Sequence, residues 1–485
     1  MQSVFNIDNP LLSIRRTKIV VTMGPASSEP STIEQLIEAG ASVFRINMSH
    51  GSHEAQAKTY NNIRSTSKRL SCPVAVIADL MGPKMRVGRF QGGKMNLTPG
   101  QSVTVTTRDV MGGGGLIPSQ YEALCDDVTP GRSILMDDGC IEIKVESIEG
   151  TEIACTVVHG GVLKDRKGMN LPGVEVSAPS LTDKDNRDVE FAVGIGVDFL
   201  ALSFVRRAED VLSLRGLVKG LKADTHIIAK IERPEALDSI SEILDASDGI
   251  MVARGDLGVE IPQHKVPVVQ HELIDHARLR HKPVIIATQM LESMTNNSRP
   301  TRAEVSDVSH AAFSGADAVM LSAETAVGKY PVEAVRVIDN VVRHVEAWQW
   351  AESGFGSLML KGDDKAVPVA EAVARGAWKM SRKLGVRCLV VPSTSGATSR
   401  VISSTRPAAP IFGLTSSPET FRRMNLLWGV VPHEVPQIKG SELRRYARNI
   451  AREAGLAAEG ENLLLIAGFR PNVAESEPTI TVLKA

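Results

Sequence analysis

Short and almost continuously apolar runs recur along the chain as far as residue 323, and segments with the apolar spacing of amphipathic helices separate them. Strands without polar alternation are typical of a parallel sheet that helices cover on both faces. Eight such strand–helix units predict a (β/α)8 barrel. A doubly wound sheet is the alternative, but no Gly-rich fingerprint follows the first strand. The predicted strands are residues 18–24, 41–47, 73–79, 197–203, 226–232, 249–255, 283–288 and 318–323.

The pattern changes in the long stretch between the third and fourth runs. Segments such as QSVTVTT and TEIACTVV alternate apolar and polar residues, which is typical of antiparallel β structure. We therefore predict a small β domain over residues 84–178, inserted into a barrel domain that comprises residues 1–83 and 179–346. Because the βα loops lie on the catalytic face of a barrel, this domain is expected to act as a lid.

A second change follows residue 346, where the eight units are complete. A polar, Gly-containing stretch over residues 347–359 is interpreted as a linker. Helical and apolar strand-like segments then alternate again, as in VRCLVVPS and NLLLIAG. They predict a separate C-terminal α/β domain over residues 360–485.

Composition narrows the expected partners. The 485 residues carry a net charge of −1 and 4% aromatic side chains, so neither a nucleic acid nor a membrane surface is an expected partner. No apolar run is long enough to span a bilayer, the start lacks the pattern of a secretory signal, and the five cysteines form no CxxC pair. A cytoplasmic location is therefore expected.

Polar side chains end almost all of the predicted barrel strands, where barrel enzymes carry their chemistry. Lys230 and Glu232 lie on one side of the fifth strand, and Asp256 follows the sixth. Two carboxylates from adjacent strands suit Mg²⁺, which favours one or two carboxylates together with substrate phosphate and water. The other strand-end residues include Arg45, Asn47, Ser49, Asp79, Thr288, Gln289, Ser322 and Glu324.

The types of these residues indicate phosphate chemistry. A lysine beside a metal carboxylate can stabilise a transferring phosphoryl group, and Arg45 can grip phosphate with its planar fork. Lys230 and Glu232 taken alone could be a solvated ion pair. Taken together, and without a Ser–His–Asp or Cys–His constellation, the strand ends predict Mg²⁺-dependent handling of a phosphorylated or enolate-forming small molecule.

Long blocks of the sequence resemble the pyruvate kinases. The blocks KIVVTMGPASS, FRINMSHG, IIAKIERPEAL, SDGIMVARGDLGVEIP, ATQMLESM and DAVMLSAETAVGKYP stand in the order of that family and extend over nearly the whole chain. The resemblance implies transfer of a phosphoryl group from phosphoenolpyruvate to ADP, giving pyruvate and ATP. It also implies a regulatory C-terminal domain and a homotetramer.

The resemblance further implies roles for individual residues. Glu232 and Asp256 would hold Mg²⁺, Lys230 would stabilise the phosphoryl group in flight and the enolate left behind, and Arg45 would hold the phosphate. The residues implied for the substrate carboxylate are Gly255, Asp256 and Thr288, and the candidates for a hydroxyl–water relay that protonates the enolate are Thr288 and Ser322.

A second Mg²⁺ is implied to arrive with the nucleotide. Asp137 and Asp138 of the predicted lid fall where the lid of the family approaches the site, although an Asp-Asp-Gly turn is an equally open interpretation. The residues implied to face the nucleotide are Pro25, Asn47, Arg86 and Lys167.

The stretch DLMGPKMRVG departs from many relatives that require K⁺. Such relatives hold K⁺ at positions that correspond to Asn47, Ser49, Asp79 and the carbonyl of Leu80, with threonine at position 80 and glutamate at position 84. Here Leu80 and Lys84 stand instead. A lysine ammonium can supply the charge of a bound K⁺, so we expect no K⁺ requirement. A solvent-facing Lys84 is the alternative.

A Ser/Thr/Gly-rich turn in the C-terminal domain follows a predicted strand and precedes a helical pattern. Backbone N–H groups and hydroxyls at such a turn can bind an anion, although an N-cap by Ser393 or Thr394 is the other interpretation. Many relatives that are regulated by fructose 1,6-bisphosphate carry a basic residue where Ala397 stands, and the later segment GFRPNVAESEP adds acids. We therefore expect a monophosphate effector, such as a sugar monophosphate or AMP. The candidate effector residues are Ser393, Ser395, Gly396 and Thr398.

Two alternatives to a glycolytic kinase remain at this point. One is a Mg²⁺–enolate barrel lyase or aldolase, against which the implied nucleotide residues argue, since a lyase needs no ADP site. The other is a non-catalytic metabolite sensor, against which an intact Lys230, Glu232 and Asp256 argue.

Overall fold

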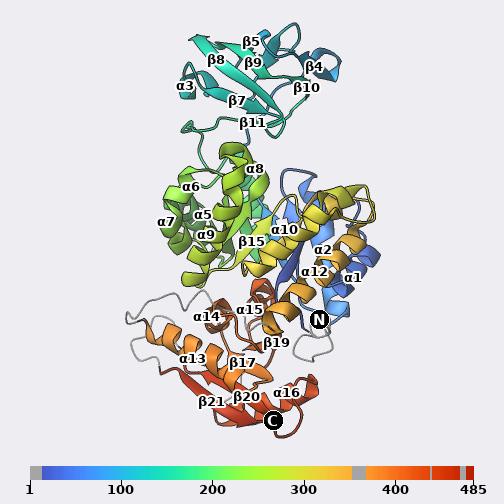
Figure 1. Cartoon of the computed structure of the whole chain (residues 1–485), viewed down its shortest axis with the longest axis vertical. Coiled ribbons are helices and arrows are strands. Elements are labelled where there is room, and N and C mark those ends of the chain that lie inside the picture. The colour runs from blue at the N-terminus through green and yellow to red at the C-terminus, as the bar shows by residue number, and fades with distance from the viewer. Residues whose placement is uncertain (1–13, 352–366, 437–439, 470–476) are drawn as a thin grey trace.

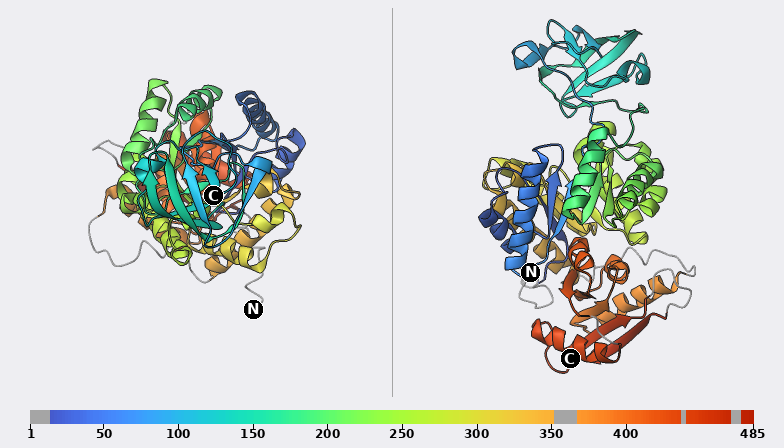
Figure 2. Two further views of the ribbon diagram at one scale, coloured as in Figure 1. Left: turned by 90° about the horizontal axis from the view of Figure 1, so that it is seen from above. Right: turned by 180° about the vertical axis from the view of Figure 1, so that it is seen from behind.

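The computed structural model describes residues 14–351, 367–436, 440–469 and 477–485. Three parts follow one another along the long axis of the molecule: an inserted β domain, a central barrel and a C-terminal α/β domain (Figure 1, Figure 2). Viewed along that axis, the inserted domain overlies one end of the barrel (Figure 2). None of the described helices is long and apolar enough to cross a membrane.

The central part is a closed barrel of eight parallel strands, which confirms the fold predicted from the apolar runs. The strands follow one another round the barrel in chain order, and β1 pairs with β16 to close it. Both faces of each strand are apolar because one faces the interior and the other packs against helices. The strands are β1 (Lys18–Thr22), β2 (Val43–Asn47), β3 (Ala75–Asp79), β12 (Phe199–Leu202), β13 (His226–Ile231), β14 (Gly249–Ala253), β15 (Val284–Ala287) and β16 (Ala318–Leu321).

Helices surround the barrel, and local signals mark their ends. Thr182 and Asp185 form a capping box at the start of α4, and Gly196 ends that helix in the left-handed conformation (φ 86°). Thr301 and Glu304 form the same box at the start of α10. The helices are α1 (Pro30–Glu38), α2 (His53–Arg69), α4 (Asp183–Ile195), α5 (Ala208–Gly220), α6 (Glu235–Asp238), α7 (Ile240–Ala246), α8 (Arg254–Glu260), α9 (Val266–Leu279), α10 (Arg302–Phe313), α11 (Ala323–Ala326) and α12 (Pro331–Ala351).

The interior of the barrel is a column of buried apolar side chains. Strand residues such as Ile77, Ile228 and Met251 fill it. Leu426, which belongs to the C-terminal domain, joins the same cluster and is 0% exposed. A residue from another domain therefore completes the core of the barrel.

The inserted domain contains two sheets and has its own hydrophobic core. The larger sheet has the order β11-β7-β8-β9-β5-β6 and the smaller pairs β10 with β4. The pairing is antiparallel as predicted, except that β5 and β6 pair in parallel. The elements are β4 (Lys94–Leu97), β5 (Ser102–Thr106), β6 (Leu116–Pro118), α3 (Leu124–Asp127), β7 (Ser133–Met136), β8 (Ile141–Glu149), β9 (Glu152–His159), β10 (Gly161–Lys164) and β11 (Met169–Asn170).

The C-terminal domain is a five-stranded sheet with helices. Its order is β19-β18-β17-β20-β21, and β21 runs antiparallel to β20 at the edge. Its elements are α13 (Val369–Lys383), β17 (Cys388–Pro392), α14 (Ala397–Ser404), β18 (Ile411–Thr415), α15 (Pro418–Arg423), the 3-10 turn η7 (Met424–Leu426), β19 (Val430–Glu434), α16 (Gly440–Glu453), β20 (Asn462–Ala467) and β21 (Thr479–Lys484).

Ion pairs join this domain to the amino end of the barrel. Arg406 pairs with Asp317 at 2.9 Å, and Arg422 pairs with Asp198 at 2.7 Å. Both aspartates are almost fully buried. Breaking the Arg406–Asp317 contact would leave a buried carboxylate without its cation, which is costly, whereas Asp198 would keep Arg64 at 2.6 Å. These contacts dock the C-terminal domain on the barrel.

The predicted domain boundaries remain predictions. Helix α12 continues to Ala351, beyond the predicted end of the barrel domain at residue 346. Most of the predicted linker, from residue 352 onward, lies outside the described residues. Residues 470–476, which contain most of the acidic segment GFRPNVAESEP, lie outside them as well.

Candidate active site

A pocket of about 150 Å³ opens at the carboxyl ends of the barrel strands. This end of the barrel faces the inserted domain (Figure 1). The pocket brings together side chains that are far apart in the sequence, as expected for strand ends that meet at one rim. The sequence-predicted residues that line it are Arg45, Asn47, Ser49, Asp79, Leu80, Lys84, Arg86, Lys230, Glu232, Asp256, Thr288 and Ser322.

Asp79 is a buried anion between two cations. Its Oδ2 accepts a hydrogen bond from Arg45 Nε at 2.6 Å, and its Oδ1 lies 3.4 Å from Lys230 Nζ. Burial raises the pKa of Asp79, but Arg45 and Lys230 together outweigh burial and hold that pKa below its usual value. A charged Asp79 therefore orients both cations toward the pocket.

Lys230 is held by three oxygen atoms. Its Nζ lies 2.8 Å from Glu232 Oε1 and donates to Ser203 Oγ at 2.7 Å, in addition to the contact with Asp79. Burial lowers the pKa of Lys230, but Asp79 and Glu232 raise it above its usual value. Glu232 accepts a second bond from the backbone N–H of Phe204 at 2.7 Å. The site therefore carries a lysine that is protonated at any physiological pH and has little freedom to move.

Asp256 and Thr288 form the opposite wall. Asp256 lies in the first turn of α8, and its Oδ1 is 3.5 Å from Lys84 Nζ. The backbone N–H of Gly255 donates to Thr288 Oγ1 at 2.7 Å. Thr288 has a φ of +67°, which is strained for a β-branched residue. Its carbonyl accepts a bond from Arg254 at 2.6 Å, which helps to hold this conformation at the pocket.

Comparison with known proteins decides the family to which this site belongs. The family described as "Pyruvate kinase, barrel domain" matches residues 14–335, and "Pyruvate kinase, alpha/beta domain" matches residues 371–483.

The chain belongs to the pyruvate kinase family.

Curated relatives and a solved structure agree. A pyruvate kinase of Geobacillus stearothermophilus is 43% identical over 458 residues, which cover 94% of this chain and 78% of the relative. One of Agrobacterium vitis is 43% identical over 459 residues, or 94% of each chain. The crystal structure of a pyruvate kinase from Cryptosporidium parvum superposes with a TM-score of 0.90 at 34% identity and covers 98% of this chain and 97% of that one.

The carboxylates fit the magnesium site that the family resemblance implies. Each oxygen of Glu232 has one protein partner and retains a free lone pair, and Asp256 is partly exposed at the pocket. Two carboxylates with room for phosphate oxygens and water form a donor set that Mg²⁺ favours. Over the described part of the chain, no group of three His, Cys, Asp or Glu side chains forms a closed metal site. The two carboxylates therefore suit an ion that is shared with a ligand.

The residues of the implied monovalent-cation position share the same pocket. Asn47 Oδ1 accepts the N–H of Ser49 at 3.1 Å, and the carbonyl of Leu80 accepts the hydroxyl of Ser203 at 2.7 Å. Lys84 lines the pocket with them, but its ion pair is with Asp256. The side chain of Lys84 is 32% exposed, so it is neither buried nor free in solvent.

Not all implied nucleotide residues reach the pocket. Arg86 lines it and also donates to the carbonyl of Arg166 at 2.9 Å. Pro25 is exposed in the loop after β1, and Lys167 pairs with Asp137 at 2.6 Å within the inserted domain. Neither is among the residues that line the pocket.

Asp137 and Asp138 both have positive φ, at 53° and 55°, and begin the turn that connects β7 to β8. The tip of this turn reaches the barrel, because a Cβ added at Gly139 would lie 3.6 Å from Val259. The turn interpretation therefore holds for these two aspartates, and their position at the tip is also compatible with an approach to the site.

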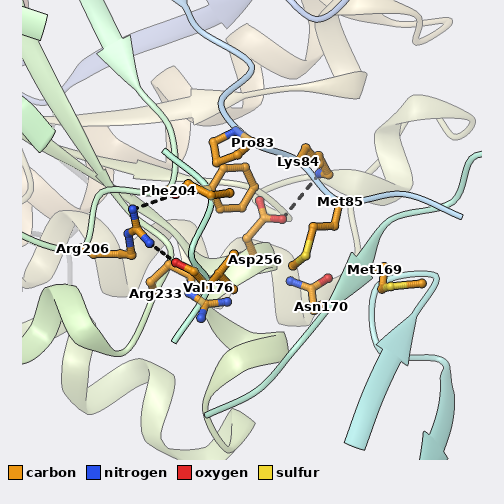
Figure 3. A pocket seen from close by; sticks show the side chains of 11 residues that line it. Pro83, Lys84, Met85, Met169, Asn170, Val176, Phe204, Arg206, Arg233 and Asp256 are labelled. Atoms are coloured by element: carbon orange, nitrogen blue, oxygen red, sulfur yellow. Dashed lines mark hydrogen bonds and ion pairs between the residues drawn. The ribbon is translucent and has the colours of Figure 1, made fainter. Parts of the chain in front are cut away.

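A second, smaller pocket lies where the chain passes between the barrel and the inserted domain (Figure 3). Lys84 and Asp256 stand at one side of it. On the other side, Arg206 donates to the carbonyls of Val176 and Ala178. The connection that returns from the inserted domain is thus held to the barrel by hydrogen bonds that its backbone carbonyls accept. The connection that leaves the barrel for the inserted domain places Lys84 at the active site.

The candidate effector loop lies in the C-terminal domain, far from the pocket in the chain. Ser393 follows β17 and is buried, and its Oγ has no hydrogen-bond partner in the described structure. Gly396 is the N-cap of α14, with a φ of 80° that favours glycine. Thr398 is buried in the first turn of α14, and Ser395 is exposed. No side-chain N-cap bond forms, so the N-cap interpretation for Ser393 or Thr394 is not realised.

Sequence reasoning missed Ser203. Its hydroxyl accepts from Lys230 and donates to the carbonyl of Leu80, so it connects the lysine to the third strand. The signal was present, because Ser203 ends the apolar run VDFLALS at the same rim as the other strand-end residues. Glu324, by contrast, is a structural residue that accepts the N–H groups of Leu291 and Ser322.

Proposed function

We propose that the chain catalyses phosphoryl transfer from phosphoenolpyruvate to ADP, giving pyruvate and ATP, the last step of glycolysis. Membership of the pyruvate kinase family makes it a phosphotransferase. The observation that carries the substrate assignment is Lys230. It is a protonated lysine fixed by Asp79 and Glu232 at the rim of a pocket that also contains Arg45 and Asp256.

Arg45 and Lys230 bind the phosphate of phosphoenolpyruvate in this proposal. Asp79 holds both side chains in place before the substrate arrives, so their positive charges need little reorganisation when negative charge shifts during transfer. Lys230 then stabilises both the phosphoryl group and the enolate oxygen. The buried position of the lysine strengthens this effect, since water screens it little.

Thr288 and the backbone of Gly255 and Asp256 hold the carboxylate of the substrate. The enolate must accept a proton at carbon, and the hydroxyls of Thr288 and Ser322 are positioned at the same pocket to relay it through water. Neither hydroxyl has a proton that is acidic enough on its own, so both act by orienting a water chain.

Glu232 and Asp256 hold Mg²⁺, and a second Mg²⁺ arrives with the nucleotide. Bound there, the metal supplies positive charge to the oxygen atoms of the phosphoryl group and of the substrate. The protein's contribution is to present two carboxylates from neighbouring strands and to keep Glu232 in place through Lys230 and Phe204.

The nucleotide binds between the barrel and the inserted domain, which acts as a lid. Asn47 and Arg86 face it from the pocket, and Pro25 and Lys167 lie outside the pocket until the lid closes. The Lys167–Asp137 pair keeps the lysine at the lid edge in the meantime. Closure would exclude water from the transferring group.

Lys84 replaces K⁺ in this proposal, so the enzyme does not require that ion. Lys84 shares the pocket with Asn47, Ser49 and Asp79, and its ammonium can move between Asp256 and those oxygens on a flexible stem.

Regulation by a monophosphate effector, a sugar monophosphate or AMP, at residues 393–398 is part of the same proposal, as are a homotetramer and a cytoplasmic location. The absence of a basic residue at Ala397 favours a single phosphate.

One assay tests the catalytic proposal. The protein is supplied with phosphoenolpyruvate, ADP and Mg²⁺, and both pyruvate and ATP are measured. Equal amounts of the two products are expected. Pyruvate without ATP would indicate a lyase or phosphatase, and the absence of both at normal folding would indicate a sensor. No described feature of the site favours either alternative.

A further inference from the structure

The inserted domain reaches the far end of α8, the short helix whose first turn forms one wall of the active site. Asn170, the last residue of β11, donates its side-chain amide to Glu260 Oε1 at 3.1 Å. The turn that connects β7 to β8 meets the same helix, because a Cβ added at Gly139 would lie 3.6 Å from Val259. Asp256 lies one helical turn before Glu260 in α8. A movement of the inserted domain therefore acts on the element that carries Asp256.

Glu260 is held from the barrel side by Arg233, which directly follows Glu232 in the chain. Arg233 Nη1 donates to Glu260 Oε1 at 2.8 Å, and both side chains are almost fully buried. Burial lowers the pKa of Arg233, but Glu260 and Glu235 raise it above its usual value, so the guanidinium keeps its charge. The ion pair therefore joins the two segments that supply the proposed metal carboxylates, Glu232 and Asp256.

Arg233 also binds the connection that returns from the inserted domain. Its Nη2 donates to the carbonyl of Val174 at 2.8 Å. In Figure 3, Arg233 lies at the small pocket together with Val176 of that connection and with Asp256. One buried guanidinium is thus in contact with both the returning connection and the helix of Asp256.

Only one oxygen of the Glu260 carboxylate is held. Arg233 and Asn170 both contact Oε1, whereas Oε2 is buried and has no hydrogen-bond partner among the residues that the structure describes. A buried carboxylate oxygen without a donor is unfavourable, and an ion pair with a purely structural role would be expected to satisfy both oxygens. The carboxylate is therefore positioned by two polar contacts, one of which comes from the inserted domain.

We propose that Arg233 and Glu260 are positioning residues for the metal site, and that they transmit the place of the inserted domain to Glu232 and Asp256. When the inserted domain shifts, the amide of Asn170 moves against Glu260 and α8 follows, so the separation of the two metal carboxylates changes. Mg²⁺ demands nearly ideal ligand geometry, so a small change in that separation alters its affinity. The metal is therefore bound best at one position of the lid.

The two positioning residues matter only if Glu232 and Asp256 hold the metal, so the inference rests on the proposed function. Neither Arg233 nor Glu260 lines the active-site pocket, so both act through their neighbours. Coupling between two places in a protein is reciprocal in free energy. Metal binding must therefore stabilise one position of the inserted domain by the same factor by which that position strengthens metal binding.

Binding of Mn²⁺ to the full chain, followed by electron paramagnetic resonance, tests the inference without measuring turnover. Mn²⁺ stands in for Mg²⁺ because it prefers the same oxygen ligands. The test variant is Asn170→Ala, which removes the contact from the inserted domain and leaves the Arg233–Glu260 pair in place. The matched control is Asn96→Ala, at an exposed position on β4 of the same domain. Asp256→Asn reports any Mn²⁺ that binds elsewhere.

Asn170→Ala is expected to raise the Kd of Mn²⁺ about fivefold or more, the lower end of the range for coupling between two sites. Asn96→Ala should leave the Kd unchanged. In the unmodified chain, Mn²⁺ should also slow amide hydrogen exchange over residues 171–178, and this protection should be lost in Asn170→Ala. A merely structural asparagine would change the melting temperature and neither of these measurements.

A second variant removes both charges of the ion pair together. The double substitution Arg233→Met and Glu260→Met leaves no buried charge without a partner, so the fold is expected to tolerate it. It should weaken Mn²⁺ binding at least as much as Asn170→Ala and should also abolish the protection of residues 171–178.

An unchanged Mn²⁺ affinity in either variant, with normal binding by the unmodified chain, would overturn the inference and leave the proposed metal site standing. If the unmodified chain and Asp256→Asn bind Mn²⁺ equally, the metal site itself fails, and the inference fails with it. The two failures are therefore distinguished by the same set of titrations.

Discussion

Lys84 Nζ lies 3.5 Å from Asp256 Oδ1, which joins the hinge of the inserted domain to a carboxylate of the proposed magnesium site (Figure 3). Both side chains are about one third exposed, so the ion pair is weak and easily exchanged. A metal at Asp256 would replace the lysine as its counter-charge. The Lys84 ammonium would then be free to contact the oxygen atoms of Asn47, Ser49 and Asp79, which line the same pocket.

The first prediction concerns K⁺. Lys84→Glu should make activity depend on K⁺, with a rate in KCl at least about tenfold above that in tetramethylammonium chloride at equal ionic strength, because it removes a positive charge from a partly buried site. The unmodified chain should be equally active in both salts. Lys144→Glu, an exposed position on β8, is the matched control. Strong K⁺ stimulation of the unmodified chain would contradict the assignment.

The second prediction concerns Lys230. Lys230→Met should lower kcat about 100-fold or more, the usual loss when one preorganised charge at a transition state is removed. It should also lower the free energy of unfolding by roughly 3 kcal/mol, since Glu232 and Asp79 lose a buried partner. Initial rates and urea unfolding measure the two effects, with Lys144→Met as control. Near-normal ATP formation would remove Lys230 from the mechanism.

The third prediction concerns the inserted domain. Arg206→Met removes the hydrogen bonds to the carbonyls of Val176 and Ala178 and should loosen the returning connection. Amide hydrogen exchange over residues 171–178 should accelerate, and the KM for ADP should rise several-fold while the KM for phosphoenolpyruvate changes less. Arg302→Met, exposed on α10, should change none of these. Unchanged exchange would show that Arg206 does not hold the hinge.

The fourth prediction concerns acid stability. The pKa of His226 falls from 6.5 to about 4 on folding, because burial outweighs the attraction of Asp248 and Asp224, and Arg423 and Arg400 lower it further. Between these two values the unfolded chain binds a proton that the folded chain does not, so stability falls as the pH falls from about 6.5 to 4.

His226→Gln should remove this component of the pH dependence. The difference in unfolding free energy between the two chains should change by at most roughly 3 kcal/mol across that window and stay flat above pH 7. Urea unfolding at several pH values measures it. Parallel curves for the two chains would show that His226 titrates normally in the fold.

Most of the barrel and of its rim could be predicted from the sequence, for a physical reason. A buried parallel strand leaves a continuous apolar run, and a polar residue at its end, such as Lys230 or Asp256, is conspicuous there. The rim could thus be assembled by position. The partners within it could not, because the pairing of Lys84 with Asp256 and of Ser203 with Lys230 depends on side-chain directions that spacing does not specify.

Contacts between domains were the least predictable part. Nothing in the order of residues indicates that Leu426 enters the barrel, since one of two adjacent leucines fits the core of its own domain equally well. The parallel pairing of β5 with β6 was missed for a similar reason, because alternation identifies a strand and says nothing of its direction.

Leu426 also limits how this protein can be divided. A fragment that stopped after α12 would lose the side chain that completes the barrel core, and would uncover Arg16, Lys18 and Asp317, all of which are buried in the whole chain. The exposed end would be an apolar opening ringed by charges that had lost their counterparts. We therefore expect the isolated barrel to aggregate when expressed. We also expect chimaeras between relatives to fold only where the barrel and the C-terminal domain come from the same parent sequence.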